Sequence, residues 1–163
     1  MRKREFTIIS IVISLFIIPA CAQEKAGAPI KQATAVDISS QEKLWLEMTD
    51  DAVTLYTQHR HKEAIALARQ ALDLAEKTFG PEHPNVAESL DNLATYLHTQ
   101  GEDKEAEVLY QRALSIVEKN FGPESEYLAI FLNYLADFYN DIGRTEKATG
   151  LQKRAQEIRL KNR

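Results

Sequence analysis

Apolar side chains recur at helical spacing along six stretches of the chain. In the most regular stretch, Leu90, Leu93 and Leu97 fall on one stripe at about 100° per residue, and polar side chains occupy the opposite side. A stripe of this kind predicts an amphipathic α-helix that buries one side against its neighbours. The pattern therefore predicts an all-α fold of six antiparallel helices, at residues 40–58, 61–78, 84–99, 103–120, 125–141 and 145–160.

The expected helix boundaries carry capping and turn residues. Ser39 and Glu42 form a capping-box pattern ahead of the first apolar run, so the first helix is expected to begin there. Gly101 and Gly143 mark the turns inside the second and third helix pairs, because glycine readily takes the left-handed conformation that ends a helix. His59 stands at the matching position of the first pair, which predicts a less regular corner there.

The three helix pairs repeat at a spacing of 42 residues, as Gly80 and Gly122 illustrate. Small residues keep the same step, and they are expected where two helices cross closely. Repetition at such a period is the mark of a helical solenoid, whose units bury their apolar faces only by stacking. The repeated alanines are Ala52, Ala94 and Ala136 on the first helices, and Ala64, Ala106, Ala148, Ala71, Ala113 and Ala155 on the second helices.

The second unit resembles a tetratricopeptide repeat of the longer kind found in kinesin light chains. The matching segments are Ser89-Leu90-Asp91-Asn92-Leu93-Ala94, Gln100-Gly101, the run from Glu105 to Glu118, and the preceding Gly80-Pro81-Glu82-His83-Pro84. An ordinary unit of this family spans about 34 residues and closes with a proline. Glu76 and Glu118 stand where that proline would fall, so each second helix is expected to continue to Gly80 or Gly122.

The resemblance implies a helical-hairpin solenoid of three tetratricopeptide-type units, at about 44–80, 84–122 and 125–160, within a repeat domain over 39–163. It also implies a protein-binding role. The two ends depart from the repeat, since Asp51 stands where later units carry Leu93 and Leu135. Polar ends keep a solenoid soluble, and the last helix is expected to present the basic side chains Lys153, Arg154, Arg159, Lys161 and Arg163.

Residues 1–22 have the pattern of a signal peptide. Three basic residues precede an apolar run from Phe6 to Ile18, which is too short for a comfortable membrane span. An uncleaved N-terminal anchor is the alternative. Residues 23–38 lack apolar periodicity and aromatic residues, and they are expected to form a flexible tether.

Cys21, the single cysteine of the chain, ends this apolar run after Ala20 and resembles the acylated cysteine of a bacterial lipoprotein. Pro19 departs from that pattern. Ala20-Cys21-Ala22 is also an ordinary cleavage pattern, which would release a soluble protein that begins at Gln23. Both routes predict an exported protein in the periplasm or on the periplasmic face of a membrane, and a single cysteine allows no internal disulfide.

Charge and composition narrow the function further. The net charge of −4 becomes −6 when residues 1–22 are removed, and no basic stripe with aromatic residues suggests nucleic-acid binding. His59 and His61 lie two positions apart at a turn without an evident third ligand, so no metal site is expected. No serine has a histidine positioned to activate it as a nucleophile. The Gly-Pro elements lack the lysine that follows the glycines of a phosphate-binding loop. The sequence predicts neither an enzyme nor a cofactor.

The side of the first helices opposite the apolar stripe is the candidate binding surface. In the resembling family this side lines a concave groove that receives a peptide or a helix, and the less favoured alternative is a plain solvated face. It lacks lysine and arginine, which disfavours a carboxylate clamp and favours a neutral or basic partner segment. An alternative is a structural subunit that stacks through its end faces on another solenoid or on a copy of itself, as a homo-oligomer. The candidate groove residues are Tyr56, Glu88, Asp91, Asn92, Thr95, His98, Ile130, Asn133, Tyr134, Asp137 and Asn140.

Overall fold

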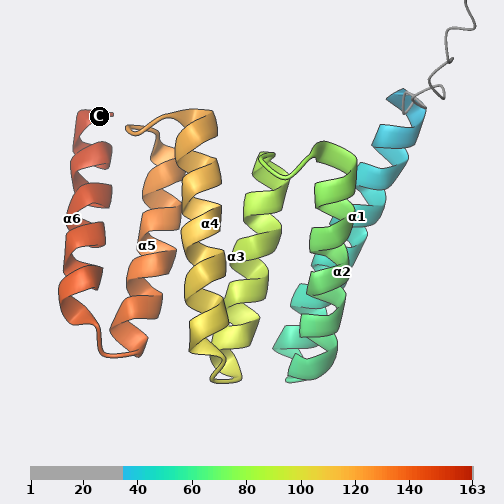
Figure 1. The fold of residues 1–163 in the computed structure, drawn as a ribbon, viewed down its shortest axis with the longest axis horizontal. Helices are drawn as coiled ribbons and strands as arrows, with labels where there is room; N and C mark the ends of the chain where they lie inside the picture. Colours follow the sequence, from blue (N-terminus) through green and yellow to red (C-terminus); the bar gives the residue numbers. More distant parts are fainter. Residues whose placement is uncertain (1–34, 163) are drawn as a thin grey trace, which may run out of the picture. The chain divides into compact units, whose positions relative to one another are not determined.

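The computed structural model describes residues 35–162, which form six α-helices and no strand. Successive helices alternate in direction and lie next to each other in chain order (Figure 1). The expected signal segment 1–22, with Cys21, and residues 23–34 of the expected tether lie outside the described residues. The helices are α1 (Ala35–Thr57), α2 (His61–Phe79), α3 (Pro84–Thr99), α4 (Asp103–Phe121), α5 (Glu126–Asp141) and α6 (Thr145–Lys161).

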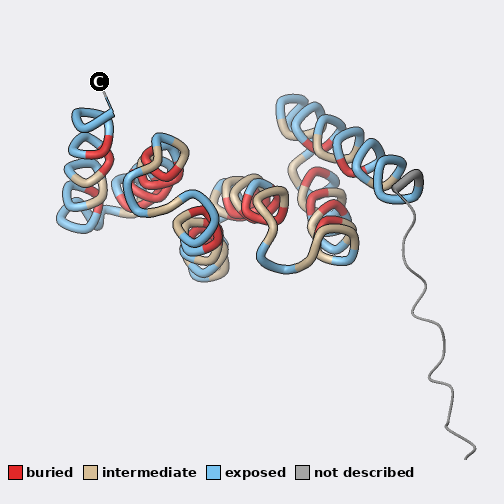
Figure 2. The backbone as a smooth tube through the Cα atoms, turned by 90° about the horizontal axis from the view of Figure 1, so that it is seen from above, coloured by how far each residue is buried: buried red, intermediate tan, exposed pale blue. Residues whose placement is uncertain are grey.

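The helices form three hairpins that stack into a tetratricopeptide-type solenoid, as the sequence predicts. The hairpins are α1 with α2, α3 with α4, and α5 with α6, and contacts between α2 and α3 and between α4 and α5 join each hairpin to the next. Buried residues line the sides on which consecutive helices face each other (Figure 2). All nine repeated alanines are buried, as expected for residues at close helix crossings.

The first helix begins earlier than expected. Because α1 starts at Ala35, the assignment of residues 35–38 to a tether is wrong, and Ser39 does not cap the helix. Ser40 lies inside the helix, where its hydroxyl donates to the backbone oxygen of Asp37 at 2.8 Å. The additional turn lies beside the end of α2, where Ile38 and Leu74 line a common cleft. This tertiary contact explains why local capping signals misplace the boundary.

The corner inside the first hairpin is as regular as the other two, so the expected irregularity at His59 is wrong. His59 takes a left-handed conformation with φ of 62°. The φ values of Gly101 and Gly143 at the other two corners are 78° and 76°. Each corner contains the same backbone hydrogen bond. The amide of Arg60 donates to the backbone oxygen of Leu55 at 3.0 Å. The amides of Glu102 and Arg144 donate in the same way to the backbone oxygens of Leu97 and Tyr139. The packing of the hairpin therefore imposes a backbone conformation that histidine seldom adopts.

The second helices continue to Phe79 and Phe121, as their sequences predict, and Gly80 and Gly122 follow with φ of 91° and 86°. Side chains then tie each second helix to the next hairpin. The sequence predicts that the basic side chains of the last helix point outward. Arg154 and Lys161 instead form ion pairs with Glu118 and Glu124. The repeated ion pairs are Glu76 with Arg112, Glu118 with Arg154, Glu82 with Lys119, and Glu124 with Lys161.

Replacement of His59 by glycine is expected to stabilise the domain by about 0.5 to 1 kcal/mol. The left-handed conformation costs a residue with a side chain about 1 to 2 kcal/mol, and the greater freedom of glycine in the unfolded chain offsets part of this gain. Urea denaturation of His59→Gly and of the unmodified domain measures the difference.

The matched control for this change is Gly101→Ala, at the equivalent corner of the second hairpin. A β-carbon at Gly101 would meet no atom within 4 Å, so only backbone strain acts there, and this variant should lose about 1 kcal/mol. A His59→Gly domain that is less stable than the unmodified one would contradict the strain at this corner.

Candidate partner-binding groove

The expected groove residues all lie outside the buried core, on the side of α1, α3 and α5 that the sequence assigns to them. Their exposure differs along the three helices. Glu88, Ile130, Tyr134, Asp137 and Asn140 are exposed, whereas Tyr56, Asp91, Asn92, Thr95, His98 and Asn133 are partly buried.

The two partly buried asparagines, Asn92 and Asn133, line different spaces. Asn92 lines a small cavity between α1, α2 and α3, whereas Asn133 lines an open cleft beside α6 with Gln152 and Arg159. The repeat explains this separation, because Asn92 is equivalent to Tyr134 and Asn133 is equivalent to Asp91. The two asparagines therefore do not act together in one subsite, contrary to what their shared residue type suggests.

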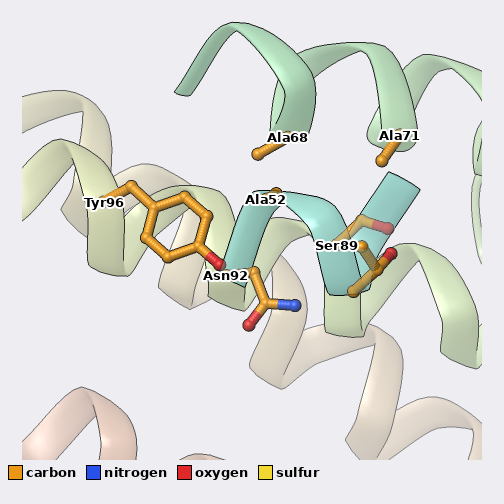
Figure 3. A pocket seen from close by; sticks show the side chains of 7 residues that line it. Ala52, Ala68, Ala71, Ser89, Asn92 and Tyr96 are labelled. Carbon is orange, nitrogen blue, oxygen red and sulfur yellow. The ribbon is translucent and has the colours of Figure 1, made fainter. Parts of the chain in front are cut away.

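The cavity between α1, α2 and α3 contains polar groups that sequence reasoning missed (Figure 3). Tyr96 is only 3% exposed, and its hydroxyl, which points toward the cavity beside Asn92, has no hydrogen-bond partner among the described residues. The hydroxyl of Ser89 already has two hydrogen-bond partners, since it accepts from Trp45 Nε1 at 2.8 Å and donates to the backbone oxygen of Asn85 at 3.0 Å. The cavity lining consists of Thr49, Ala52, Ala68, Ala71, Ser89, Asn92 and Tyr96.

The space between α3 and α5 is filled and acidic. The hydroxyl of Tyr110 lies 2.9 Å from the hydroxyl of Thr95, which itself donates to the backbone oxygen of Asp91 at 3.0 Å. The carboxylate of Asp91 is partly buried, and its Oδ1 atom has no hydrogen-bond partner among the described residues. Burial, and to a lesser degree the neighbouring carboxylate of Glu88, raises the pKa of Asp91 to about 7.

Two of the expected groove residues are engaged in contacts between hairpins. His98 lies between two carboxylates, with its Nδ1 atom 2.7 Å from Asp103 and its Nε2 atom 3.5 Å from Asp141. Tyr56 stacks on Tyr96 with ring centres 4.7 Å apart. His98 and Tyr56 each contact the first helix of a neighbouring hairpin, through Asp141 and Tyr96 respectively.

Basic side chains are unevenly distributed between the two kinds of helix. Helices α3 and α5 contain no lysine or arginine. Asp50 on α1 adds negative charge to this side, since its carboxylate is one cause of the raised pKa of Glu88, after burial. Most basic side chains of the second helices are instead in ion pairs. The carboxylates of α3 and α5 are Glu88, Asp91, Glu126, Asp137 and Asp141.

Within residues 35–162, no group of three or more histidine, cysteine, aspartate or glutamate side chains is placed to hold a metal ion. The rings of His59 and His61 lie 5.8 Å apart and cross at a steep angle. None of the six described helices is both long enough and apolar enough to cross a membrane.

The fold and the repeat pattern identify the family. The tetratricopeptide repeat family matches residues 52–119 and 104–161, and the chain belongs to this family. Its fold is also similar to that of solved kinesin-light-chain-like repeat proteins. No curated protein matches the chain.

Three solved structures illustrate the likeness. BtubC (BKLC) from P. vanneervenii is 23% identical over 74% of this chain and 48% of its own, with a TM-score of 0.68. A putative kinesin light chain from Podosopora anserina with nearly identical repeats is 24% identical over 72% of this chain and 56% of its own, with a TM-score of 0.65. The repeat domain of Arabidopsis FLU is 20% identical over 76% of this chain and 99% of its own, with a TM-score of 0.62. At these identities the likeness shows the fold, and this chain spans about half the length of BtubC.

Replacement of Asp91 by asparagine is expected to change the pH dependence of stability. Because the pKa of Asp91 is raised in the folded domain, the folded state keeps a proton that the unfolded state releases between about pH 4 and pH 7. The contribution of Asp91 to the free energy of unfolding therefore falls as the pH rises through this window. At about pH 8, Asp91→Asn should be more stable than the unmodified domain by about 1 kcal/mol, and at about pH 4 the two should be equal.

Urea denaturation at the two pH values measures this effect, and Asp137→Asn is the matched control because Asp137 is an exposed carboxylate of the same groove. The control should give the same difference at both pH values. A pH-independent effect of Asp91→Asn would contradict the burial of an unpaired carboxylate at this position.

Proposed function

We propose that this chain is a non-enzymatic protein-interaction module that binds a neutral or basic segment of a partner protein in the groove formed by α1, α3 and α5. Tetratricopeptide repeat domains are generally modules of protein–protein interaction, and this chain belongs to that family. The observation that supports the preference for a basic partner is the absence of lysine and arginine from α3 and α5. Groove carboxylates such as Glu88 and Asp137 have no basic neighbour on α3 or α5, and complementary charge speeds association and excludes wrong partners.

The groove also offers groups that are suited to a peptide. The Asn92 side chain makes no hydrogen bond to the described residues, and an amide can both donate to and accept from a partner's backbone. Ile130 and Tyr134 are 38% and 45% exposed, and they supply apolar contact area on α5. The groove therefore combines negative charge, free amides and exposed apolar side chains.

Stacking of copies through the end faces is the second candidate function, and exposed Leu44 and Leu160 at the two ends favour it. The polar substitutions at these ends weigh against it. In α6, Gln152 and Arg159 occupy the positions that Tyr110 and Val117 fill in the buried contact between α4 and α5. Burial of such polar groups without partners is costly, so we favour groove binding.

Selection of peptides from a random library displayed on phage, with the repeat domain immobilised, tests the groove. The selected peptides should be enriched in lysine and arginine, and Glu88→Gln combined with Asp137→Asn should weaken their binding about three- to tenfold at low salt. The matched control is Glu146→Gln with Glu157→Gln on α6, which removes the same charge from exposed positions away from the groove. Selected peptides that are acidic, or that respond only to the α6 control, would overturn the proposal.

We further propose that the protein is exported and carries a lipid on Cys21, since the sequence at 1–22 has the pattern of a signal segment that ends at a single cysteine. The repeat domain would then act in the periplasm or at the periplasmic face of a membrane. Metabolic labelling with a fatty acid should mark the unmodified protein and not Cys21→Ser. An unlabelled protein whose mature chain begins at Gln23 would replace the lipoprotein with a soluble exported protein.

A further inference from the structure

The groove side of α1, α3 and α5 carries different kinds of side chain at equivalent positions of the repeat. Leu46, Glu88 and Ile130 are related by the 42-residue step, so they occupy the same position on the three first helices. All three side chains are exposed, and apolar Leu46 is the most exposed side chain of α1 among the large apolar ones, at 48%. An acidic side chain on the middle helix therefore stands between exposed apolar side chains on the two flanking helices.

Further exposed apolar side chains lie on the flanking helices and not on the middle one. Tyr134, one turn from Ile130 on α5, is exposed, and so is Val53, two turns from Leu46 on α1. Helix α3 has no exposed large apolar side chain. Single exposed apolar residues need no explanation, but here they are grouped on the two helices that flank an acidic third helix.

The negative charge in the middle of this surface is not neutralised. Desolvation, and to a lesser degree the carboxylate of Asp50 on α1, raises the pKa of Glu88. Within residues 35–162, neither carboxylate has an ion-pair partner. A cation beside both carboxylates would relieve their repulsion, so the middle of the surface is complementary to a basic side chain.

The spacing of the first helices limits which side chains of a bound segment can reach all three. The rings of Tyr56 and Tyr96, with centres 4.7 Å apart, link α1 to α3. The Nε2 atom of His98 lies 3.5 Å from a carboxylate oxygen of Asp141 and links α3 to α5. The axes of packed helices lie about 8 to 10 Å apart. In a polyproline II segment every third residue points to the same side, and such residues are about 9 Å apart.

The side chain of Asn92 favours an extended segment over a helix. It lies on the groove side of α3, is partly buried, and makes no hydrogen bond to the described residues. An amide of this kind can donate to and accept from a backbone whose polar groups are free. A polyproline II segment has no internal hydrogen bonds, whereas a helix uses most of its backbone groups internally.

We propose that the groove binds an extended segment of a partner protein in which a basic residue has one apolar residue three positions before it and another three positions after it. The inference rests on the proposed groove function and specifies its partner. The segment crosses α1, α3 and α5 in a polyproline-II-like conformation. Its basic side chain lies beside Glu88 and Asp50, and its two apolar side chains contact Leu46 on α1 and Ile130 on α5.

The peptides that phage selection yields on the unmodified domain test this pattern. They should align on a lysine or arginine with apolar residues three positions before and after it. Replacement of the basic residue by glutamine should weaken binding to the unmodified domain about three- to tenfold at low salt. The same replacement should have little further effect on binding to Glu88→Gln, because the two changes remove the same interaction.

The apolar contacts are tested on the domain itself. Leu46→Ser and Ile130→Ser should each weaken binding about three- to tenfold, because each removes apolar contact area. The matched control is Val108→Ser, which removes a 61% exposed apolar side chain from the second helix α4 and should leave binding unchanged. The three side chains are exposed, so all three variants should keep the midpoint of thermal unfolding of the unmodified domain.

An exchange between units tests the middle position. Glu88→Ile copies the residue of α5 onto α3 and makes this position apolar on all three first helices. Phage selection repeated on this variant should yield peptides with an apolar residue in place of the basic one. A Glu88→Ile domain that still selects a central lysine or arginine would overturn the contact with Glu88.

The outcomes separate this inference from the proposed function. Basic peptides that bind the groove but do not respond to Leu46→Ser or Ile130→Ser would overturn the pattern and leave the groove function in place. Peptides with apolar residues seven positions from the basic residue would overturn the extended segment, because residues seven apart share one side of a helix. If no selected peptide is sensitive to the Glu88 and Asp137 changes, the groove function fails, and this inference fails with it.

Discussion

The close packing of helices at alanine positions is the constraint on which the rest of this structure depends. Ala64, Ala106 and Ala148 are fully buried, and each allows the second helix of a hairpin to approach the first closely. One such hairpin cannot bury its apolar faces by itself, so each hairpin must stack on another. Stacking joins α2 to α3 and α4 to α5, and this arrangement leaves one side of α1, α3 and α5 free.

The polar contacts between hairpins determine where charge remains unpaired. Glu76 pairs with Arg112 and Glu118 pairs with Arg154, and these pairs connect the second helices of successive units. Asn120 adds a bond from α4 to the connector before α3, since its side-chain amide donates to the backbone oxygen of Glu82. Helices α3 and α5 contain no lysine or arginine, so their carboxylates have no basic partner within these two helices.

The positions that repeat and the positions that vary have different consequences. The alanines, the corner residues and the ion pairs between units recur at the 42-residue step and maintain the stacking. The residues between successive hairpins vary, since Ala68 on α2 stands where α4 has Tyr110, and Ser89 on α3 stands where α5 has Phe131. Such variation changes the shape and polarity of each space while the backbone arrangement stays the same. A repeat protein can therefore carry different binding properties in successive units.

The helices, their pairing and the side of the first helices that stays outside the core can be predicted from the sequence alone. Apolar periodicity records which side of a helix is buried, and Gly101 and Gly143 end their helices through a local backbone preference. For this reason the expected boundaries of α2 to α6 agree with the structure to within one residue.

Features that depend on several helices at once can be seen only in the tertiary structure. The start of α1 at Ala35 accompanies a contact with α2, and the hairpin imposes the left-handed conformation of His59, although neither residue signals it locally. The raised pKa of Asp91 depends on burial between hairpins. The unpaired hydroxyl of Tyr96 lies in a space whose volume is set by side chains from three helices. The pattern along one helix identifies a buried face, but it does not fix the volumes and partners that neighbouring helices bring to it.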